Sequence, residues 1–512
     1  MQYILAIDSG STGIRAVLFN KKGEIVVHEY EKTTALYLKA GWIEHDPNEL
    51  WQSLITIVNR IFENPGVSPK DIAAIGITNQ RASFTLWDRD TGKPVINFIN
   101  WADVRSANTC EQMNKNKKWR LLKKLAWVAC RITRNTMLTA TSMLNYTTDH
   151  VTVRLRWVLD NIEGLYDRCK AAEIAFGTID SWFIYKLTGG KVHATDYSNA
   201  ATGLLNPFQL KWNKPILSIF NIPMEILPEL KDTTGNYGTT DPTLFQGAEI
   251  PIRAACGDQQ AALFGQCCFE KGDVKISQGS GSFVDMNVGE TGKLSKRGLF
   301  PLVAWVINGK RTYMLEGFVA TAGTLIDWLG QGIGLYDTPK ILNEYAAKCE
   351  DTEGVICIPT PSGIRFPYFS PNARGTILGL SLNTHRSHVA RAVFEGIALR
   401  LVDIFEGLEK DTKISIRSLR ADGGVSKSDI MLQCLADFAN LEVIRAPEPD
   451  MTATGAAYLA GLSIGFWQDK RQLQEIYLRM EPQHFHPSMD SHKRIEKIIR
   501  WKRALEAILS ID

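Results

Sequence analysis

The sequence predicts an α/β fold built from two halves. Short apolar runs typical of buried strands alternate along the chain with segments whose apolar residues recur at helical spacing. Each half also opens with one shared pattern, in which two strand-like runs flank a small turn rich in glycine and serine. Strands that alternate with helices are typical of the α/β class.

The first half supplies most of this alternation. Its predicted strands are residues 3–8, 14–19, 72–78, 174–176 and the start of 252–264. Its predicted helices are residues 47–63, 181–187 and the end of 252–264. Pro47 is suited to the first turn of its helix, because a proline there loses no helical hydrogen bond.

The second half repeats the pattern. Residues 274–277 are strand-like and run into a turn at 279–282, and residues 416–421 alternate as a half-buried strand before Asp422-Gly423-Gly424. We place the boundary near residue 265, which gives domains at 1–265 and 266–512.

Charge and cysteine content exclude several classes of function. The 58 Lys and Arg against 55 Asp and Glu leave a net charge of +3, which provides no general field for holding nucleic acid. No apolar stretch approaches the roughly 18 residues of a membrane span. The nine cysteines are odd in number and lack a CxxC pair, which favours a reduced, cytoplasmic protein.

The glycine and hydroxyl turns are candidate phosphate sites. Backbone N–H groups and hydroxyls in such turns can approach a phosphate closely. The sequence has neither a P-loop nor a G-x-G-x-x-G dinucleotide motif. Instead, turns at Asp8–Gly13 and Gly279–Ser282, with Asp422-Gly423-Gly424, form a set able to grip a polyphosphate. A single glycine hairpin would more often be only a turn.

An ordered series of motifs carries a family resemblance over nearly the whole chain. The motifs are Asp8-Ser9-Gly10-Ser11-Thr12, Gly41-Trp42-Ile43-Glu44-His45-Asp46-Pro47, Gly76-Ile77-Thr78-Asn79-Gln80-Arg81, Gly177-Thr178-Ile179-Asp180, Gly257-Asp258-Gln259-Gln260, Gly279-Ser280-Gly281-Ser282-Phe283 and Ala421-Asp422-Gly423-Gly424. In these the chain resembles the glycerol kinase branch of the FGGY carbohydrate kinases, and a divergent animal group within it. The resemblance implies two ribonuclease-H-like domains of the actin/Hsp70/sugar-kinase fold with an interdomain cleft. It also implies ATP-dependent phosphorylation of glycerol to glycerol 3-phosphate.

The resemblance also implies a role for each matching residue. Asp258 matches the catalytic base that accepts the proton of the substrate hydroxyl, and Asp8 matches the carboxylate that holds Mg²⁺. Other positions match substrate contacts, namely Arg81, Trp101, Gln259 and Phe283. Those matching contacts to the ATP are Ser11, Thr12, Gly13, Arg15, Ser280, Gly323 and Gly424. An isolated Asp such as Asp258 would otherwise be interpreted as a helix cap.

Departures from the family pattern fall on the substrate and the nucleotide. Ala82 follows Arg81 where glycerol kinases carry a glutamate that binds substrate hydroxyls. One hypothesis is that Asp103, in the pattern W-x-D-x-R, supplies the missing carboxylate; the alternative is that it pairs with Arg105. A short insertion would bring Tyr146 to the position of the family's substrate tyrosine.

On the nucleotide side, Asp327 and Ser428 replace the usual glutamine and asparagine, which bears on nucleotide preference. Two alternatives to glycerol phosphorylation therefore stay open. One is a kinase of another polyol or ketose, such as erythritol or xylulose. The other is a degenerate, nucleotide-binding regulatory protein. The expected partner is a small polyol, with no nucleic acid and no membrane span, and the oligomeric state is open, a homodimer included.

One strongly basic stretch stands outside these motifs. Residues 114–134 interleave eight Lys and Arg with Trp119 and Trp127. The stretch is either an amphipathic helix that meets an acidic partner or an anionic membrane, or a solvated helix whose Leu and Trp side chains pack on the domain. We favour the second interpretation, because the net charge of the chain is balanced.

Overall fold

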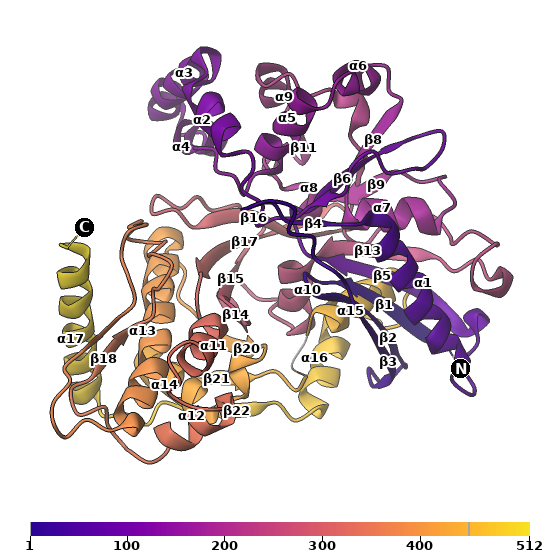
Figure 1. Ribbon diagram of the computed structural model, residues 1–512. Coiled ribbons are helices and arrows are strands. Elements are labelled where there is room, and N and C mark those ends of the chain that lie inside the picture. Colours follow the sequence, from indigo (N-terminus) through magenta and orange to yellow (C-terminus); the bar gives the residue numbers. More distant parts are fainter. Residues whose placement is uncertain (1, 449–450, 512) are drawn as a thin grey trace. The chain divides into compact units, whose positions relative to one another are not determined.

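A computed structural model describes residues 2–448 and 451–511 (Figure 1). The chain divides into two compact units. Unit 1 contains the chain up to Gly265 together with Leu302–Arg311 and Thr452–Leu473, and unit 2 contains the remainder. Helices and sheets occur in both, which confirms the α/β prediction. The first change of unit follows Gly265, and the two later segments return to unit 1.

Unit 1 is built on a five-stranded sheet of order β13-β5-β1-β2-β3. Its strands are β1 (Tyr3–Ser9), β2 (Gly13–Phe19), β3 (Ile25–Lys32), β5 (Ile72–Asn79) and β13 (Ile252–Gly257). β1, β5 and β13 are parallel to one another, whereas β2 and β3 extend the sheet antiparallel. The predicted strands at 3–8, 14–19 and 72–78 are therefore confirmed.

Helices and smaller sheets complete unit 1. The helices are α1 (Pro47–Glu63), α2 (Ala107–Lys115), α3 (Lys117–Thr133), α4 (Thr136–Met143), α5 (Val151–Asn161), α6 (Leu165–Lys170), α7 (Ile179–Leu187), α8 (Tyr197–Ala200), α9 (Lys214–Ile219), α10 (Asp258–Gly265) and α15 (Met451–Ser463). The further strands are β4 (Glu44–His45), β6 (Phe84–Asp88), β7 (Phe98–Ile99), β8 (Ile174–Thr178), β9 (Ala194–Asp196), β10 (Leu205–Asn206), β11 (Lys211–Trp212) and β12 (Glu229–Lys231). α1 covers the predicted range 47–63, and Asp46 caps it by accepting the Asn48 N–H at 2.8 Å.

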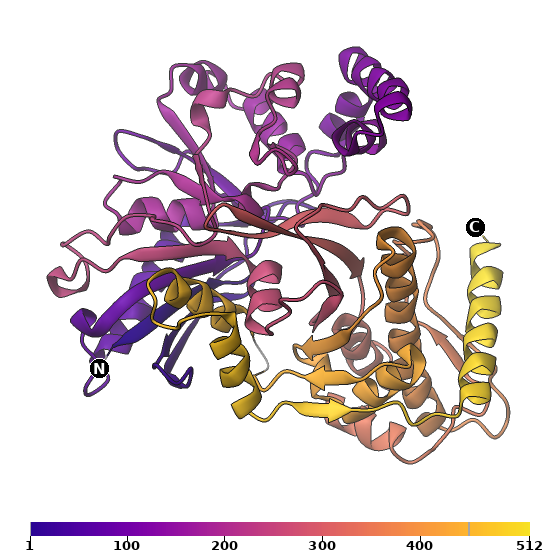
Figure 2. The ribbon, with the colours of Figure 1, turned by 180° about the vertical axis from the view of Figure 1, so that it is seen from behind.

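Glycines let α15 pack against the centre of unit 1 (Figure 2). A Cβ at Gly76 in β5 would lie 2.2 Å from the Ala456 carbonyl oxygen, and one at Gly455 would lie 1.8 Å from that of Ala261 in α10. No side chain fits at these distances. The segment from residue 452 therefore belongs to unit 1 although it lies near the end of the sequence.

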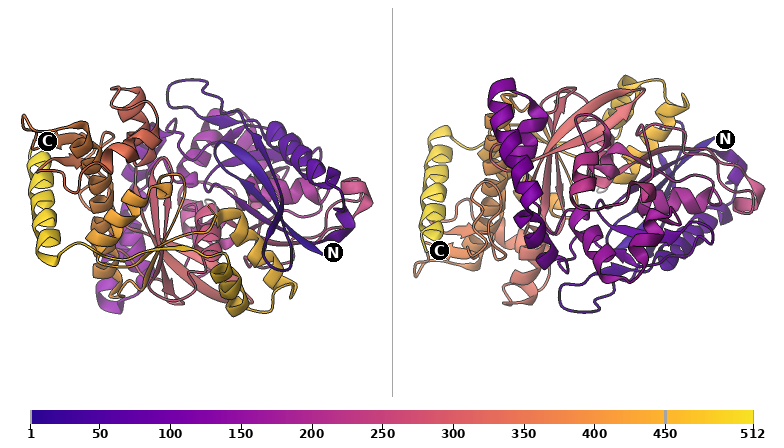
Figure 3. Two further views of the ribbon diagram at one scale, coloured as in Figure 1. Left: turned by 90° about the horizontal axis from the view of Figure 1, so that it is seen from below. Right: turned by 90° about the horizontal axis from the view of Figure 1, so that it is seen from above.

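Unit 2 carries most of a seven-stranded sheet of order β16-β17-β15-β14-β20-β21-β22. The strands are β14 (Asp273–Gln278), β15 (Ser282–Gly289), β16 (Phe300–Ile307), β17 (Lys310–Val319), β20 (Ser418–Asp422), β21 (Val443–Arg445) and β22 (Gln483–Phe485), with β18 (Ile356–Ile358) and β19 (Thr376–Leu378) in a separate pair. The helices are α11 (Gly323–Gln331), α12 (Pro339–Ala346), α13 (Arg386–Thr412), α14 (Asp429–Ala439) and α17 (Ser491–Leu509). In α16 (Lys470–Arg479) the chain changes from unit 1 to unit 2 after Leu473. α17 runs beside α13 (Figure 3), joined to it by ion pairs such as Lys497 to Glu395 at 2.8 Å.

The basic stretch at 114–134 forms α3 and the end of α2. Trp119 is fully buried and packs as predicted, but Leu121 and Leu125 are both 58% exposed. The interpretation that the leucines of this helix pack on the domain is therefore wrong for these two. The reason is helical geometry, since Trp119 and Leu121 lie on opposite sides of α3.

Within the described residues, no helix is long and apolar enough to cross a membrane. The nine cysteines are all free thiols, and several are fully buried, for example Cys256, Cys267 and Cys268. Burial raises the pKa of the Cys267 thiol to about 12, which keeps it protonated and unreactive.

Candidate active site

Three parallel strands bring polar residues to one edge of the unit 1 sheet. In the register, Asp8 of β1 lies opposite Thr78 of β5, and Gly257 of β13 lies opposite Asn79. Each strand ends at this edge; Asp258 directly follows the end of β13, and Arg81 lies two residues after the end of β5. Ligands of α/β sheets bind at the carboxyl ends of parallel strands.

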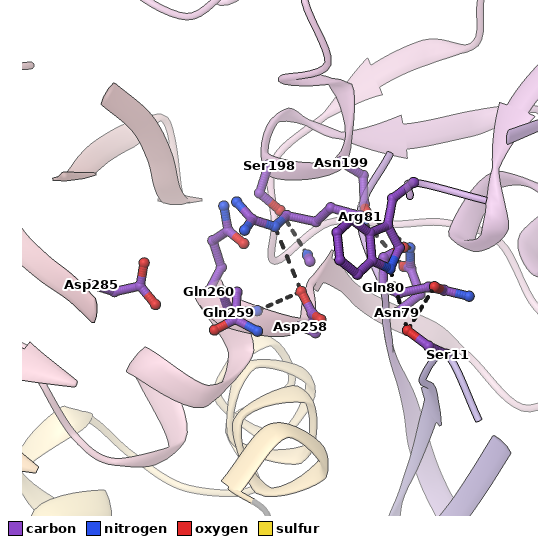
Figure 4. A network of polar contacts seen from close by, with 12 residues as sticks. Ser11, Asn79, Gln80, Arg81, Ser198, Asn199, Asp258, Gln259, Gln260 and Asp285 are labelled. Atoms are coloured by element: carbon purple, nitrogen blue, oxygen red, sulfur yellow. Dashed lines mark hydrogen bonds and ion pairs between the residues drawn. The ribbon is translucent and has the colours of Figure 1, made fainter. Parts of the chain in front are cut away.

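Asp258 is the first residue of α10 and keeps an accessible carboxylate (Figure 4). Its Oδ1 accepts the Gln259 N–H at 2.8 Å and lies 3.6 Å from Arg81 Nε. The side chain is 28% exposed. The helix N-terminus and the guanidinium both favour the anion, so Asp258 is held in place without being enclosed.

Asp8 lies nearby and is buried. Burial raises its pKa to about 6, Arg15 opposes this rise, and the charge of Asp258 adds to it. Arg15 Nη1 is 3.4 Å from Asp8 Oδ2 across the β1–β2 hairpin. Two carboxylates and two arginines thus share this edge of unit 1.

The β1–β2 turn is tied to the end of β5 by Gln80. Its Oε1 accepts the Ser11 hydroxyl at 3.0 Å and the Asn100 amide at 3.3 Å, and Trp101 Nε1 donates to Ser11 Oγ at 3.4 Å (Figure 4). Ser11 and Thr12 remain exposed, and Trp101 is 37% exposed. The turn is therefore held in place by these hydrogen bonds, and Ser11 and Thr12 remain accessible to solvent.

Unit 2 holds a second set of turns at one edge of its own sheet. β14 and β20 are parallel, with Ser277 opposite Asp422, so the turns that follow them lie together. A Cβ at Gly423 would lie 2.5 Å from the Gln278 carbonyl oxygen, and Gly423 has a φ of +90°. Only glycine fits this close approach in a left-handed conformation.

The start of α11 packs on the first of these turns. The N–H groups of Ala322 and Gly323 donate to the carbonyl oxygens of Ser280 and Gly279 at 2.9 and 3.0 Å. A Cβ at Gly323 would lie 2.6 Å from the Gly279 oxygen. Ser280 is exposed, as is Gly424, whose Cβ position is open. These turns are free to receive a ligand from solvent.

Comparison with known proteins agrees with this arrangement. Residues 3–265 match the N-terminal domain of the FGGY family of carbohydrate kinases, and residues 274–464 match its C-terminal domain. The chain belongs to the FGGY family of carbohydrate kinases. The resemblance seen in the sequence motifs is confirmed.

Individual relatives match this chain over almost its full length. A glycerol kinase of Thermoanaerobacter sp. (strain X514) is 42% identical, and one of Francisella philomiragia is 41% identical, each covering 99% of this chain and 98% of the relative. The crystal structure of Plasmodium falciparum glycerol kinase with ADP superposes with a TM-score of 0.89 at 32% identity, covering 99% of this chain and 98% of that one. The predicted two-domain FGGY fold is confirmed.

Asp103 does not face a substrate in this FGGY kinase. Its side chain is fully buried, with Oδ2 accepting the Ile43 N–H at 2.7 Å and Arg105 Nη2 at 2.7 Å, and Oδ1 accepting Arg105 Nε at 2.9 Å. Both oxygens are therefore occupied, and the hypothesis that Asp103 replaces the missing glutamate is wrong. The alternative, pairing with Arg105, is what the structure shows, although in the interior.

Arg105 extends this pairing into a cluster that fixes the loop after Trp101. It bridges Asp103 and Glu44, the latter at 2.6 Å, and lies over the Trp42 ring at 3.9 Å from its centroid. The pattern W-x-D-x-R and the motif around Trp42 thus pack together, which explains why both occur. The cluster positions the Trp101 loop and leaves the substrate contacts to other residues.

Tyr146 also lies away from the polar edge. It is 2% exposed and packs in an apolar cluster, with ring centroids 5.3 Å from Trp119 and 5.1 Å from Phe220. Burial raises the pKa of its hydroxyl. The expectation that Tyr146 contacts substrate is therefore contradicted, because the side chain serves the core below α3.

The other positions predicted in unit 2, Ser428, Asp327 and Phe283, differ in their surroundings. Ser428 Oγ accepts the Met431 N–H at 3.1 Å and caps α14, so it is engaged in the fold. Asp327 is exposed on α11. Phe283 packs against Phe318 in a tilted arrangement with ring centroids 4.6 Å apart. Their contacts with nucleotide and substrate stay predictions.

Sequence reasoning missed Gln80, Asn100 and Arg154. Arg154 is fully buried in α5 and donates to the Asn100 carbonyl oxygen at 2.6 Å, which holds the strand end before Trp101. Gln80 lies inside a quoted motif, so its position was visible, but only the structure shows that it connects two loops. Nothing in the local pattern around Arg154 marks it.

Behind Asp258 lies a layer of buried carboxylates. Ser198 Oγ accepts the Gly257 N–H at 2.9 Å and donates to Asp196 Oδ1 at 2.9 Å, which anchors the end of β13. Burial raises the pKa of Asp180 to about 6. Burial and the charge of Asp180 raise the pKa of Asp196 to about 7.

These raised pKa values predict how stability depends on pH. An unfolded Asp ionises near pH 4, so between about pH 4 and 7 folded Asp196 holds a proton that the unfolded chain has lost. The free energy of unfolding therefore falls as pH rises, by up to about 1.4 kcal/mol per pH unit for such a group. We expect Asp196→Asn to gain stability relative to wild type between pH 5 and 7 and the difference to level off above 7, measured by urea unfolding.

Asp88→Asn is the control for this measurement. Hydrogen bonds from Thr91 lower the pKa of Asp88, so this carboxylate is ionised in both states above about pH 4. Its stability difference from wild type should be constant from pH 5 to 8. A constant difference for Asp196→Asn as well would contradict the prediction.

The carboxylates at this edge suit a metal held jointly with a ligand. The described residues contain no group of three or more His, Cys, Asp or Glu able to cage a metal ion. Mg²⁺ is usually bound through one or two carboxylates together with substrate phosphates. Asp8 with the nearby Asp258 fits that requirement and does not fit a metal bound by protein alone.

Proposed function

We propose that this FGGY kinase transfers the γ-phosphate of ATP to glycerol, giving glycerol 3-phosphate and ADP. The observation that carries the proposal is the accessible Asp258 carboxylate, held at the edge of unit 1 by the start of α10 and by Arg81. Full-length identity of 41–42% to proteins described as glycerol kinases supports glycerol as the substrate.

Asp258 acts as the general base in this proposal. It accepts the proton of a glycerol hydroxyl while that oxygen bonds to the γ-phosphorus and the bond from phosphorus to the bridging oxygen of ADP breaks. Such proton transfer contributes about 10²–10⁴-fold to a rate. Arg81 and Gln259, which contact the carboxylate, together with Trp101 on the neighbouring loop, orient the alcohol.

Each unit, taken by itself, offers glycine and hydroxyl turns as contacts for the nucleotide. In unit 1 these are the exposed hydroxyls of Ser11 and Thr12, with Gly13 and Arg15 in the same hairpin. In unit 2 they are Ser280, Gly323 and Gly424. Asp8 would hold Mg²⁺, which offsets the negative charge of the phosphates when it is bound.

A direct assay tests the proposal. Purified protein is incubated with ATP, Mg²⁺ and glycerol, and glycerol 3-phosphate is measured beside reactions with erythritol and D-xylulose. Formation of glycerol 3-phosphate supports the proposal. Turnover of erythritol or xylulose alone would assign a sibling activity, and ATP binding without turnover of any acceptor would favour a regulatory protein.

One residue favours a larger acceptor as the second candidate. Ala82 stands where glycerol kinases carry a glutamate, is half-buried, and has a φ of +61°. Alanine is smaller than glutamate at this position, and Asp103 does not supply the missing carboxylate, since both of its oxygens are occupied.

Ala82→Glu tests which acceptor the site suits. A restored carboxylate that pairs with glycerol hydroxyls is worth about 1–3 kcal/mol, so we expect the KM for glycerol to fall about tenfold with little change in kcat. The substitution keeps a Cβ and so adds no new backbone strain. Ala82→Gln, of equal size without charge, should give a smaller decrease, and an unchanged KM for both would show that residue 82 does not reach the acceptor.

The reaction is placed in the cytoplasm, as a further part of the proposal. The nine free cysteines support this, because a reducing compartment keeps thiols unpaired.

A further inference from the structure

Helix α3 exposes an aliphatic row on the side opposite its buried face. Leu121, Leu125, Val128 and Ile132 follow one another at intervals of four, three and four residues, which places them on one face of a helix. They are 58%, 58%, 46% and 80% exposed. We call these four residues the α3 stripe. Trp119 and Ala126, on the opposite side, are buried.

The α3 stripe is bordered by cations and by no acid. α3 contains six Lys and Arg and neither Asp nor Glu. At 100° per residue, Lys117, Lys124 and Arg131 lie along one border of the stripe and Lys118 along the other. Arg131 stacks over Trp127 at 3.6 Å from its ring centroid, and Trp127 is itself 47% exposed.

The position of the helix makes this face accessible within unit 1. Figure 1 and Figure 3 show α3 at the outer edge of the unit, away from its five-stranded sheet. The stripe runs over the twelve residues 121–132, whose eleven steps along the axis cover about 16 Å of helix. α4, which packs beside α3, carries no charged residue and buries none of its side chains.

The charge around the α3 stripe indicates whether a second copy of this chain or a membrane surface binds there. A second copy of this chain would bring the acid-free cationic borders of two α3 helices together, and like charges would repel. A helix with aliphatic residues on one side, Lys and Arg at the borders and Trp beside them is the pattern of helices that lie in a membrane interface. Lysine stems can extend along the apolar layer while their ammonium groups reach lipid phosphates.

We propose that α3 docks on the surface of a bilayer rich in anionic lipids. The stripe enters the boundary between headgroups and acyl chains, and the bordering cations meet the anionic headgroups. This inference goes beyond the proposed kinase function and does not depend on it, because no residue of α3 belongs to the candidate active site.

Flotation of the full-length protein with vesicles tests the proposal. We expect at least about tenfold more bound protein on vesicles of phosphatidylcholine with 30% phosphatidylserine, taken here as roughly the content of an anionic surface, than on phosphatidylcholine alone. Binding should weaken as salt rises from about 0.05 to 0.5 M. Absence of binding to the anionic vesicles, or equal binding to both, would overturn the proposal.

Variants distinguish binding through the α3 stripe from nonspecific hydrophobic adsorption to the vesicles. Leu125→Asp/Ile132→Asp should reduce binding about tenfold or more. Both positions are exposed, so we expect the variant to fold, and circular dichroism checks this. Leu478→Asp is the matched control, since Leu478 is also a helical leucine and is 63% exposed. Equal loss with the control would overturn the proposal. A further outcome would also overturn it: the wild type forms a dimer but binds no vesicles, and Leu125→Asp/Ile132→Asp abolishes the dimer. The face would then belong to a second copy of the chain.

Discussion

Asp258→Asn should reduce kcat for glycerol phosphorylation about 10²–10⁴-fold and leave the fold intact. An amide cannot accept the hydroxyl proton, whereas its size and its oxygen preserve the contact with the Gln259 N–H. ATP binding should persist, because the proposed phosphate turns are unchanged. Steady-state kinetics at saturating ATP and glycerol, with ATP affinity by calorimetry, measure both effects.

Asp88→Asn is the matched control for this loss. Asp88 also forms an ion pair with an arginine, Arg168 at 2.7 Å, and its side chain is 24% exposed, close to the 28% of Asp258. We expect its kcat to remain within about twofold of wild type, as for surface changes outside a site. If Asp258→Asn retained activity comparable to Asp88→Asn, Asp258 would not be the base.

Lys275→Met should destabilise unit 2 by about 3–5 kcal/mol, the usual cost of leaving a buried charge without its partner. Lys275 Nζ donates to Asp285 Oδ2 at 2.7 Å across β14 and β15, and both side chains are fully buried. Burial raises the pKa of Asp422, and the same ammonium opposes that rise. Removal of Lys275 leaves both carboxylates uncompensated beneath the glycine turns. The urea midpoint of unfolding measures the loss.

A double variant distinguishes charge from packing. Lys275→Met/Asp285→Leu should recover much of the stability, since apolar residues of similar volume often replace a buried ion pair without loss. Lys410→Met removes an exposed partner of Glu406 at 2.9 Å and should cost no more than about 1 kcal/mol. A wild-type midpoint for Lys275→Met would contradict the prediction.

Local patterns were sufficient for most of the fold. The apolar runs of β1, β2 and β5 and the helical spacing of α1 are signals carried by neighbouring residues, and each element was confirmed. The return of α15 to unit 1 was not predicted, because it depends on Gly76 and Gly455, whose partners lie hundreds of residues away. Single glycines carry no sign of what approaches them.

The candidate site was predictable in its chemistry but less so in its geometry. Asp8, Arg81 and Asp258 were named from motifs, and the structure brings them to one sheet edge. Asp103 carries a carboxylate in a suggestive motif, yet both of its oxygens are already bonded. Sequence shows which acceptors exist, whereas their availability depends on contacts from distant segments such as Ile43.

The packing of α15 on β5 and α10 has a consequence for synthesis on the ribosome. Unit 1 contains residues 1–265 but also Thr452–Leu473, so its interior stays open until that later segment has emerged. The surface around Gly76 and Ala261 is then exposed to water and to neighbouring nascent chains for most of translation. Long-range closure of this kind is slow and prone to aggregation, so we expect unit 1 to complete its fold only after this distant segment has been synthesised.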